Sequence, residues 1–456
     1  MTHAHFVTRL LIDIHDTSLS MNREQDRRNF LKAGAAIAAA TTIAKSAPGQ
    51  DSAQNSATDD QDAEKIVLGI MGVNGRGKAI ARGMMQQPNV EIGYICDVDS
   101  RAAELTAMLV SKDQGKTPKI VTDFRDLLKD KDVDVLVCAA PNHWHAPATI
   151  LACNAGKHVY VEKPCSYSAQ EGEWAVQAAR KNDRVVQMGT QRRSWPALVK
   201  AIAKIHDGEI GDVLYSRTWY NNRRGPIGKG KMSSPPDWLN WDLWQGPATR
   251  REYKDNVLHY NWHWHWHWGN GELGNNGVHG IDVARWALQV DYPQRVVATG
   301  GRYRHDDDQE TPDTMMVTMN FPDEKMITWE GLSWSPLGPH DKSFGISVHG
   351  TEGSIVIRGS GYTQYDMKNK EIETDTAEGG DSDHFADFLD AVRTGRRPNA
   401  DIEIAHKSTL LCHLGNIAYR TGTIVNTNPA NGHIIDNPAA DALWSREYAD
   451  GWQPKV

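Results

Sequence analysis

A cluster of glycines and a downstream aspartate have the residue types and the spacing that could hold a dinucleotide. Gly72, Gly75 and Gly77 follow an apolar run, residues 66–71, and precede apolar residues at helical spacing. Glycines let backbone N–H groups approach a pyrophosphate, and the first turn of a helix favours negative charge. A second apolar run ends at Asp97, 25 residues after Gly72, where a carboxylate can accept from a ribose hydroxyl. Strand, turn, helix, strand and acid in this order predict a dinucleotide-binding βαβ unit.

The glycine motif departs from its usual form at one position. Asn74 stands where the pattern G-x-G-x-x-G has its second glycine, and asparagine tolerates positive φ better than most residues. Arg76 follows within the same turn. We expect Arg76 to contact a phosphate; the alternative is a solvated cation at the start of the helix.

Strand-like and helical segments alternate from residue 65 to residue 190. The continuous apolar run at residues 133–140 is typical of a strand buried in a parallel sheet. The alternation predicts an α/β fold: a Rossmann domain at residues 65–190, with ligands bound beyond the carboxyl ends of its strands. Polar side chains fall at or just past those ends: Asn74, Asp97, Asn142, Lys163 and Gln187.

From residue 191 the pattern changes to strand-like runs without intervening helices. These runs are residues 213–220, 295–303, 315–321, 326–334, 344–349 and 354–358. They predict a second domain, residues 191–456, built on an open, mainly antiparallel sheet. Helices are expected at residues 278–288, 383–393 and 402–419.

The N-terminal segment and the overall charge bear on location. Arg27 and Arg28 precede a short apolar stretch, residues 33–44, and this pattern predicts a twin-arginine export signal within residues 1–46 and a periplasmic protein. Residues 1–20 precede Met21 and are consistent with a mis-assigned start, while residues 47–64 read as a disordered linker. The apolar stretch is shorter than the roughly 20 residues that span a bilayer, which argues against stable membrane insertion. The formal net charge of −8 argues against a nucleic-acid partner.

Further motifs make the chain resemble the Gfo/Idh/MocA family of oxidoreductases, which includes glucose–fructose oxidoreductase and inositol dehydrogenase. The motifs are Gly72-Val-Asn-Gly-Arg-Gly77, Pro141-Asn-His-Trp-His145, Gly156-Lys-His-Val-Tyr-Val-Glu-Lys-Pro164, Trp241-Asp-Leu-Trp-Gln-Gly-Pro247, Gly271-Glu-Leu-Gly-Asn-Asn-Gly-Val-His279 and Ala405-His-Lys-Ser-Thr-Leu-Leu-Cys-His413. The resemblance covers residues 65 to about 455. It implies bound NAD or NADP, a sugar or polyol substrate, and a homo-oligomer formed through the open sheet.

Lys163 and His279 are the residues that we expect to exchange protons with substrate. Pro164 restricts the backbone beside Lys163 and permits a cis bond. Burial against a nicotinamide ring would lower the lysine pKa, so that the amine could take a hydroxyl proton during hydride transfer. The alternatives are a surface lysine that caps the strand and a histidine that bonds the backbone where its helix starts.

Asn275 marks a departure from the pattern that the resemblance implies. Family dehydrogenases usually have an aspartate four residues before the histidine that corresponds to His279. An amide can orient a hydroxyl or an imidazole, but it carries no charge and takes no proton. We therefore assign Asn275 to the substrate and catalytic group while regarding simple polyol dehydrogenation as weakened.

The remaining candidates flank the cofactor or the substrate. The resemblance assigns to the cofactor the loop residues Pro141, Asn142 and His145, together with Glu162 and Lys163. Gln187 and Gln191 could hold the nicotinamide amide or the substrate, or belong to polar loops.

The stretch Asn261-Trp-His-Trp-His-Trp-His-Trp268 alternates histidine and tryptophan, so an extended chain would place its histidines on one face. It leads directly into the segment that ends at His279, which assigns Trp266 and His267 to the substrate. The histidines could chelate a metal, but no carboxylate partner is identifiable, and we predict packed tryptophans and no metal.

Three functions fit these patterns. The first, which we favour, is an exported NAD(P)-dependent oxidoreductase that acts on a sugar, polyol or glycoside with a tightly bound cofactor, regenerated in place. The second is a glycosidase similar to the NAD-dependent N-acetylgalactosaminidases, which oxidise the sugar transiently and eliminate the leaving group. The third is a non-catalytic sugar-binding protein with a degenerate Rossmann site, suggested by Asn74 and Asn275. Asp97 favours NAD because it repels a 2′-phosphate, and NADP stays open.

Overall fold

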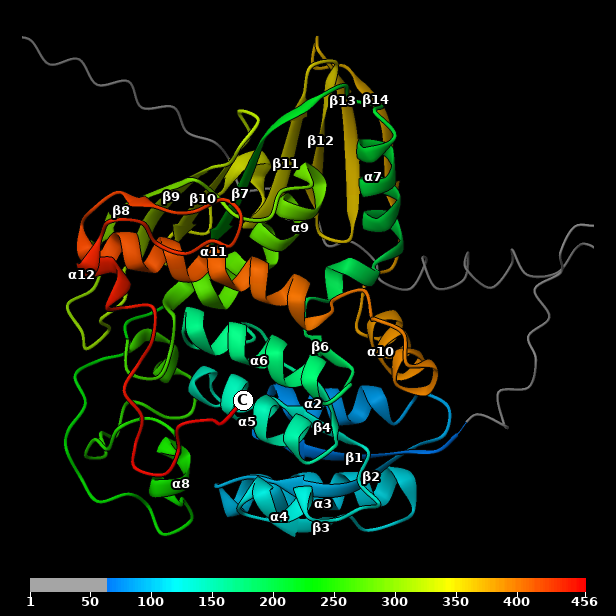
Figure 1. The fold of residues 1–456 in the computed structure, drawn as a ribbon, viewed down its shortest axis with the longest axis vertical. Helices are drawn as coiled ribbons and strands as arrows, with labels where there is room; N and C mark the ends of the chain where they lie inside the picture. Colours follow the sequence, from blue (N-terminus) through cyan, green and yellow to red (C-terminus); the bar gives the residue numbers. More distant parts are fainter. Residues whose placement is uncertain (1–63) are drawn as a thin grey trace, which may run out of the picture. The chain divides into compact units, whose positions relative to one another are not determined.

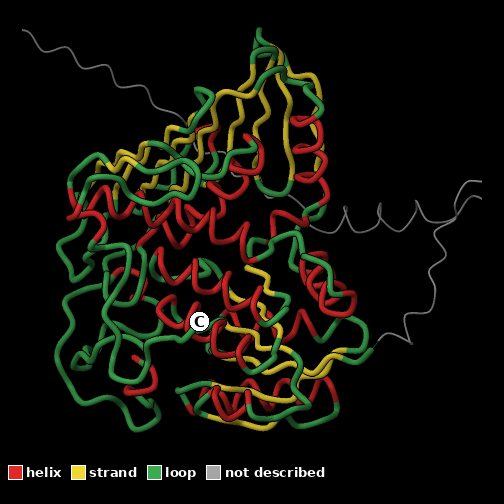
Figure 2. The backbone as a smooth tube through the Cα atoms, in the orientation of Figure 1, coloured by secondary structure: helices red, strands yellow, loops and turns green. Residues whose placement is uncertain are grey.

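A computed structural model of the chain describes residues 64–456, so the predicted export signal and nearly all of the predicted linker lie outside the described residues. Two sheets and the helices that cover them organise this part of the chain (Figure 1). The tube in Figure 2 shows that long loops connect some of these elements. None of the helices within residues 64–456 has the length and apolar character needed to cross a membrane.

The first sheet is parallel and has the strand order β3-β2-β1-β4-β5-β6. Its elements are β1 (Ile66–Met71), α2 (Arg76–Met84), β2 (Val90–Cys96), α3 (Ser100–Gln114), β3 (Lys119–Val121), α4 (Phe124–Leu128), β4 (Val135–Cys138), α5 (Asn142–Asn154), β5 (His158–Val161), α6 (Ala169–Lys181) and β6 (Val186–Met188). This is the order of a Rossmann sheet, as predicted. The strand order reverses between β1 and β4, which is where such sheets bind their ligands.

The second sheet is open and has the order β14-β13-β12-β11-β7-β10-β9-β8-β15. Its strands are β7 (Val213–Asn221), β8 (Arg295–Gly301), β9 (Thr314–Asn320), β10 (Met326–Leu332), β11 (Phe344–Gly350), β12 (Gly353–Arg358), β13 (Gly361–Asp366), β14 (Glu371–Thr376) and β15 (Val425–Asn426). Strands β7 and β10 pair in parallel, and the other neighbours pair antiparallel. The predicted mainly antiparallel sheet is confirmed.

The sequence did not indicate every strand of this sheet. Strand β14 reads Glu-Ile-Glu-Thr-Asp-Thr and is exposed or half-buried along its whole length. It forms the edge of the sheet, where polar residues are tolerated on both faces, so it lacks the hydrophobic alternation that marks a strand.

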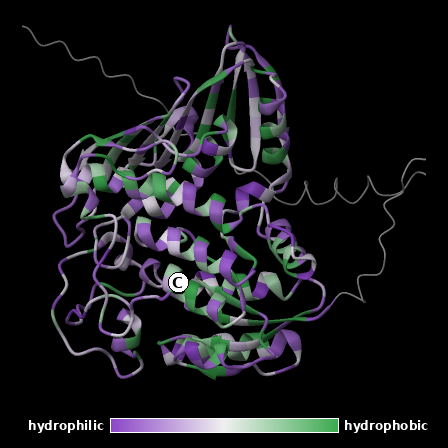
Figure 3. Cartoon of the chain, viewed as in Figure 1, coloured by the Kyte–Doolittle hydropathy of each residue, from purple (hydrophilic) through white to green (hydrophobic). Residues whose placement is uncertain are grey.

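Six α-helices follow residue 190. They are α7 (Pro196–His206), α8 (Trp241–Gln245), α9 (Val278–Leu288), α10 (Ser382–Thr394), α11 (Ile402–Thr421) and α12 (Pro438–Asp441). Helix α11 packs between α6 and β8 (Figure 1). Both α6 and α11 carry hydrophilic and hydrophobic residues in turn along their length (Figure 3).

Helix α10 belongs to the C-terminal half of the chain but packs on the Rossmann sheet. Its Phe385 and Phe388 are fully buried in the same apolar core as Ile70 of β1 and Ile80 of α2. Burial of two phenylalanines stabilises this contact by several kcal/mol, taking about 1.5–3 kcal/mol for each side chain. The packing places Asp381, which immediately precedes α10, beside the glycine turn.

Candidate active site

A cavity of about 570 Å³ opens at the carboxyl ends of β1, β2, β4 and β5. Most of the predicted site residues line it. They are Gly72, Asn74, Gly75, Arg76, Asp97, Pro141, Asn142, His145, Glu162, Lys163, Gln191, Asn275 and His279. Residues from the Rossmann domain and from the segment after residue 238 therefore face one common space.

The glycine turn is shaped for close backbone contact. Gly72 has φ of +83°, and a Cβ there would lie 2.6 Å from the backbone nitrogen of Ala140. A Cβ on Gly77 would overlap the carbonyl oxygen of Gly72, whereas a Cβ on Gly75 would meet nothing within 4 Å. Gly77 does not line the cavity, so its role is the close packing of α2 on β1, while Gly75 leaves open space for a ligand.

Asp97 holds the turn as well as facing the cavity. Its carboxylate accepts from the backbone N–H of Val73 at 2.6 Å and from that of Asp99 at 2.9 Å. Burial raises the pKa of Asp97. Next to it, the Oδ2 of Asp99 lies 3.1 Å from the Nε2 of His259. Two carboxylates thus stand at the end of β2, where a dinucleotide places its adenosine ribose.

Arg76 lines the cavity, but carboxylates bind its guanidinium. Its Nε donates to Glu162 at 2.7 Å, and its terminal nitrogens donate to the two carboxylate oxygens of Asp381 at 2.6 and 3.0 Å. Glu162 also accepts from the backbone N–H of Lys163 at 3.1 Å. The contact that we expected between Arg76 and a phosphate would therefore compete with two ion pairs. Asp381 was missed from the sequence, because only the packing of α10 brings it here.

Lys163 is held by Asn275. Its Nζ donates to the carbonyl oxygen of Asn275 at 2.7 Å and to the side-chain Oδ1 of Asn275 at 2.8 Å. The bond between Lys163 and Pro164 is cis. Burial lowers the pKa of Lys163. The lysine is therefore no solvated strand cap.

Asn275 lies in a π-helical turn, Leu273–Gly277, directly before α9. Such turns are frequent at functional sites. The side-chain nitrogen of Asn275 donates to the hydroxyl oxygen of Tyr260 at 3.2 Å. One amide therefore links the lysine to a phenol that also lines the cavity, and the phenolic O–H stays free to donate.

His279 enters the cavity from the first turn of α9. Its Nδ1 is buried and has no hydrogen-bond partner among the described residues. Burial, followed by the charges of Arg192 and Lys163, places the pKa of His279 well below its usual value. The histidine is thus neutral at pH 7 and free to bond a ligand, in contrast to the alternative of a ring bonded to the backbone.

The loop after β4 carries the other predicted cofactor residues. The ring nitrogens of His145 lie 2.7 Å from the carbonyl oxygen of Ala140 and 2.5 Å from that of Pro164. This ring therefore joins the loop at Pro141 to the turn after Lys163. Asn142 is buried and donates to the side-chain oxygen of Asn270 at 2.9 Å.

Three other predicted residues do not line the cavity. Gln187 is buried at β6, where its side-chain nitrogen donates to the carbonyl oxygen of His384 at 2.9 Å. His267 contacts the carbonyl oxygen of Thr249 through Nε2 at 2.7 Å, and Trp266 lines a separate, smaller cavity.

Residues 261–268 do not adopt the extended conformation that would place their histidines on one face. Residues 261–264 form a short 3₁₀ helix and a turn follows, so the histidines do not share one face. The chain instead turns His259, Tyr260, Trp262 and His263 toward the cavity. Among residues 64–456 no cluster of three or more potential ligands could hold a metal ion.

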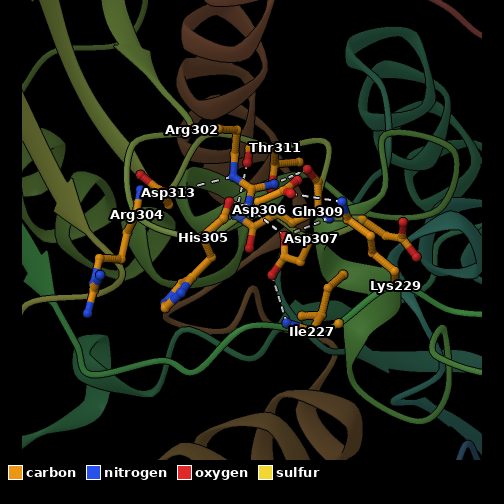
Figure 4. Close-up of polar contacts among 12 residues, drawn as sticks. Ile227, Lys229, Arg302, Arg304, His305, Asp306, Asp307, Gln309, Thr311 and Asp313 are labelled. Atoms are coloured by element: carbon orange, nitrogen blue, oxygen red, sulfur yellow. Dashed lines mark hydrogen bonds and ion pairs between the residues drawn. The ribbon is translucent and has the colours of Figure 1, made fainter.

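A polar loop, residues 302–313, contacts this aromatic segment. Figure 4 shows the polar contacts within the loop and to Ile227. Asp307 accepts from Arg302 at 2.6 Å and from the backbone N–H of Ile227 at 2.8 Å. The backbone N–H groups of Glu310 and Thr311 donate to the carbonyl oxygen of Trp264 at 2.9 and 3.2 Å. The acidic run at residues 306–308 is the sequence signal that could have indicated this anchor.

Comparison with known proteins agrees with the fold. The model of the oxidoreductase family with an NAD-binding Rossmann fold matches residues 66–190, and that of its C-terminal alpha/beta domain matches residues 213–454. The chain therefore belongs to the Gfo/Idh/MocA oxidoreductase family. A twin-arginine translocation signal matches residues 24–44, which indicates export by that pathway, as predicted.

Individual relatives are similar over parts of their length. Inositol 2-dehydrogenase of Salmonella typhimurium is 32% identical over 33% of this chain and 44% of its own length. Levoglucosan dehydrogenase of Pseudarthrobacter phenanthrenivorans is 26% identical over 52% of this chain and 58% of its own. A glycosyl hydrolase family 109 protein of Shewanella putrefaciens is 24% identical over 42% and 45%. The chain thus spans about half the length of these curated relatives.

The similarity in fold covers more of the chain than the similarity in sequence to these relatives. A solved structure of levoglucosan dehydrogenase with NADH and levoglucosan has a TM-score of 0.64 and 19% identity, and the match covers 80% of this chain and 99% of that one.

Proposed function

We propose that the protein is an exported oxidoreductase that uses NAD to oxidise a hydroxyl of a sugar, polyol or glycoside, or to reduce the corresponding carbonyl. The observation that carries this proposal is the position of Lys163. Its amine, with a pKa lowered by burial, lies in the same cavity as the glycine turn and Asp97. The relatives named inositol and levoglucosan dehydrogenase support a carbohydrate substrate.

The residues fit a nicotinamide dinucleotide. Gly72 lets the turn pack against the backbone of Ala139 and Ala140, where a Cβ would overlap, and the space beside Gly75 is open. Pro141, Asn142, His145 and Glu162 line the continuation of the cavity toward Lys163. Bound there, the dinucleotide would supply hydride transfer. Asp97 and Asp99 would repel a 2′-phosphate, which supports NAD over NADP.

Lys163 is arranged to act as the base in the oxidation. A neutral amine has two N–H groups and one lone pair. Asn275 accepts both N–H groups, through its carbonyl and its side-chain oxygen. The lone pair is left to take the proton of the substrate hydroxyl as the C–H bond gives up its hydride. Neutral His279 can hydrogen-bond to the same substrate oxygen while that oxygen loses its proton and becomes a carbonyl.

A tightly held cofactor follows from export. The twin-arginine pathway moves folded proteins, and the outer compartment has no free nicotinamide pool. The enzyme would then oxidise one carbohydrate and reduce another with the same cofactor. Assembly into a homo-oligomer through the outer face of the open sheet remains part of this proposal.

A second candidate is redox-neutral glycoside cleavage, in which transient oxidation of the sugar acidifies a neighbouring C–H and the leaving group is eliminated. The similarity to a glycosyl hydrolase family 109 protein supports it.

The test begins with protein purified after export and heated to release any nucleotide, whose absorbance is recorded. Sugar pairs and nitrophenyl glycosides are then supplied. Interconversion of sugars supports the oxidoreductase, while release of nitrophenol without net NADH supports the glycosidase. Absence of bound nucleotide, together with no binding of added NAD or NADP, would leave only the non-catalytic sugar-binding protein.

Lys163→Met tests the assigned base. We expect turnover to fall at least about 100-fold, as loss of a general base usually does. Binding of NAD, measured by fluorescence titration, should persist because the substitution does not change the glycine turn. Retained turnover would remove Lys163 from this role.

A further inference from the structure

His263 lines the cavity, and one of its two ring nitrogens is engaged while the other is free. Its Nδ1 lies 2.6 Å from the carbonyl oxygen of Tyr260. Because a carbonyl oxygen only accepts, Nδ1 carries the proton of this ring. Nε2 has no hydrogen-bond partner among residues 64–456, and it is not one of the atoms that are buried away from solvent. The free nitrogen of His263 is therefore open to a ligand.

The ring of His263 is neutral, so its free nitrogen can accept a hydrogen bond but cannot donate one. Burial lowers the pKa of His263 well below its usual value. The bond to the Tyr260 carbonyl opposes this effect, whereas the charges of Lys163 and Arg224 add to it. At neutral pH the only ring proton stays on Nδ1, which leaves a lone pair on Nε2. Only a hydrogen-bond donor can pair with that lone pair.

Aromatic packing fixes the direction of this nitrogen. The ring of His263 is stacked on that of Trp262, with 3.6 Å between the ring centres, and it lies 4.4 Å from the ring centre of Tyr260. Trp262 in turn belongs to a buried apolar cluster. An acceptor that is already held in place loses little freedom when a ligand binds to it.

The same contacts place His263 beside the reacting amine. The hydroxyl oxygen of Tyr260 accepts from the side-chain nitrogen of Asn275, whose side-chain oxygen accepts from the Nζ of Lys163. Among the charged groups, Lys163 has the strongest effect on the pKa of His263. We have assigned Lys163 and His279 to the reacting hydroxyl. Neither of them provides a partner for the lone pair of His263.

We propose that Nε2 of His263 accepts a hydrogen bond from a second hydroxyl of the substrate, so that the enzyme acts on diols and polyols in which this hydroxyl is free. A site that is built to bond a substrate hydroxyl rejects an analogue without it, because the acceptor is then left unpaired. A deoxy or an O-methyl group at that position offers no donor. This proposal rests on the proposed function and adds the feature by which the site selects its substrate.

The experiment identifies the hydroxyl that His263 binds. A panel of polyols, aldoses and anhydrosugars that includes myo-inositol, D-glucose and levoglucosan is supplied to the purified exported protein. The best substrate is then compared with its single-deoxy and single-O-methyl derivatives, with kcat/KM taken from NADH formation and affinity from calorimetry. For wild type, we expect kcat/KM to fall at least about 30-fold when one particular hydroxyl, other than the reacting one, is removed or methylated.

Substitution of His263 assigns this selectivity to its side chain. His263→Phe keeps an aromatic ring against Trp262 but has no acceptor. It should lower kcat/KM for the parent substrate by about the same factor and use the parent and the deoxy derivative nearly equally. His263→Gln has a side-chain oxygen that can accept, and it should recover part of the selectivity.

Controls separate this result from misfolding and from failure of the proposed function. His206→Phe changes an exposed histidine outside the cavity and should behave as wild type. Selectivity that persists in His263→Phe, or its absence in wild type, overturns the inference and leaves the oxidoreductase proposal intact. A loss of NAD affinity in His263→Phe would place this nitrogen on the cofactor and also overturns it.

A measurement without substrate gives an independent check. ¹⁵N NMR of protein labelled at histidine reports which ring nitrogen of His263 carries the proton, and we expect Nδ1. A proton on Nε2 at neutral pH overturns the inference. Failure of every sugar to bind or react rejects the oxidoreductase and this inference with it.

Discussion

Replacement of Asn275 by aspartate tests how the protein sets the basicity of Lys163. The side-chain oxygen of residue 275 lies 2.8 Å from the lysine Nζ, so Asn275→Asp places a carboxylate next to the amine at almost unchanged volume. An opposite charge at this distance favours the protonated amine and raises its pKa by about 1–3 units. It opposes the effect of burial, which lowers the pKa in the native protein.

The sign of the effect on rate follows from the role of the lysine. Oxidation needs the neutral amine, so the rate rises with pH through the lysine pKa. Raising that pKa moves the rising limb of the profile to higher pH by the same amount. At a fixed pH on this limb, kcat/KM of oxidation should fall roughly tenfold for each pKa unit.

The assay is kcat/KM of sugar oxidation against pH for wild type and Asn275→Asp, with NAD affinity measured in parallel. Gln294→Glu adds the same charge at an exposed position outside the cavity and should leave the profile in place. An unchanged limb, or a shift to lower pH in Asn275→Asp, would refute the assignment of Lys163 as the titrating base held by Asn275.

Two further substitutions test the scaffold of the site. Gly77→Ala forces a Cβ onto the Gly72 carbonyl and should lower the free energy of unfolding, measured with denaturant, by about 1–3 kcal/mol. The control is Gly75→Ala, whose Cβ meets no atom and which should unfold as wild type. Equal effects of the two substitutions would contradict the packing role of Gly77. Glu310→Ala removes the acceptor of the backbone N–H of Trp266 at 2.7 Å and a contact to His265 at 3.5 Å. At about 1 kcal/mol for each of the two contacts, or about 2 kcal/mol in all, it should raise the sugar KM roughly 30-fold with little change in kcat. Asp306→Ala in the same loop breaks only an exposed pair with Lys229 and serves as control (Figure 4); a rise in KM there would reject the anchoring role of Glu310.

The local sequence determined the part of the site that we assign to the cofactor. Gly72 and Asp97 follow a strand directly, and Lys163 is the second residue after one. The ends of neighbouring parallel strands meet at one edge of the sheet. Their convergence in one cavity could therefore be predicted without knowledge of long-range packing. Asn275 and His279 could be placed because their motif sits at the start of one helix.

Only the tertiary structure decided the part of the site that we assign to the substrate. Asp381 reaches Arg76 because two phenylalanines of α10 are buried on the Rossmann sheet, a contact between residues about 300 positions apart. Tyr260 and His263 line the cavity, whereas the predicted Trp266 and His267 do not. The reason is that residues 261–264 form a 3₁₀ turn, which hydrogen-bonds to the loop at residues 302–313, so the side chains do not alternate between two faces as they would in an extended strand. An alternating sequence places its residues on two faces only where the backbone is extended, and here packing against a distant loop stabilises a different conformation.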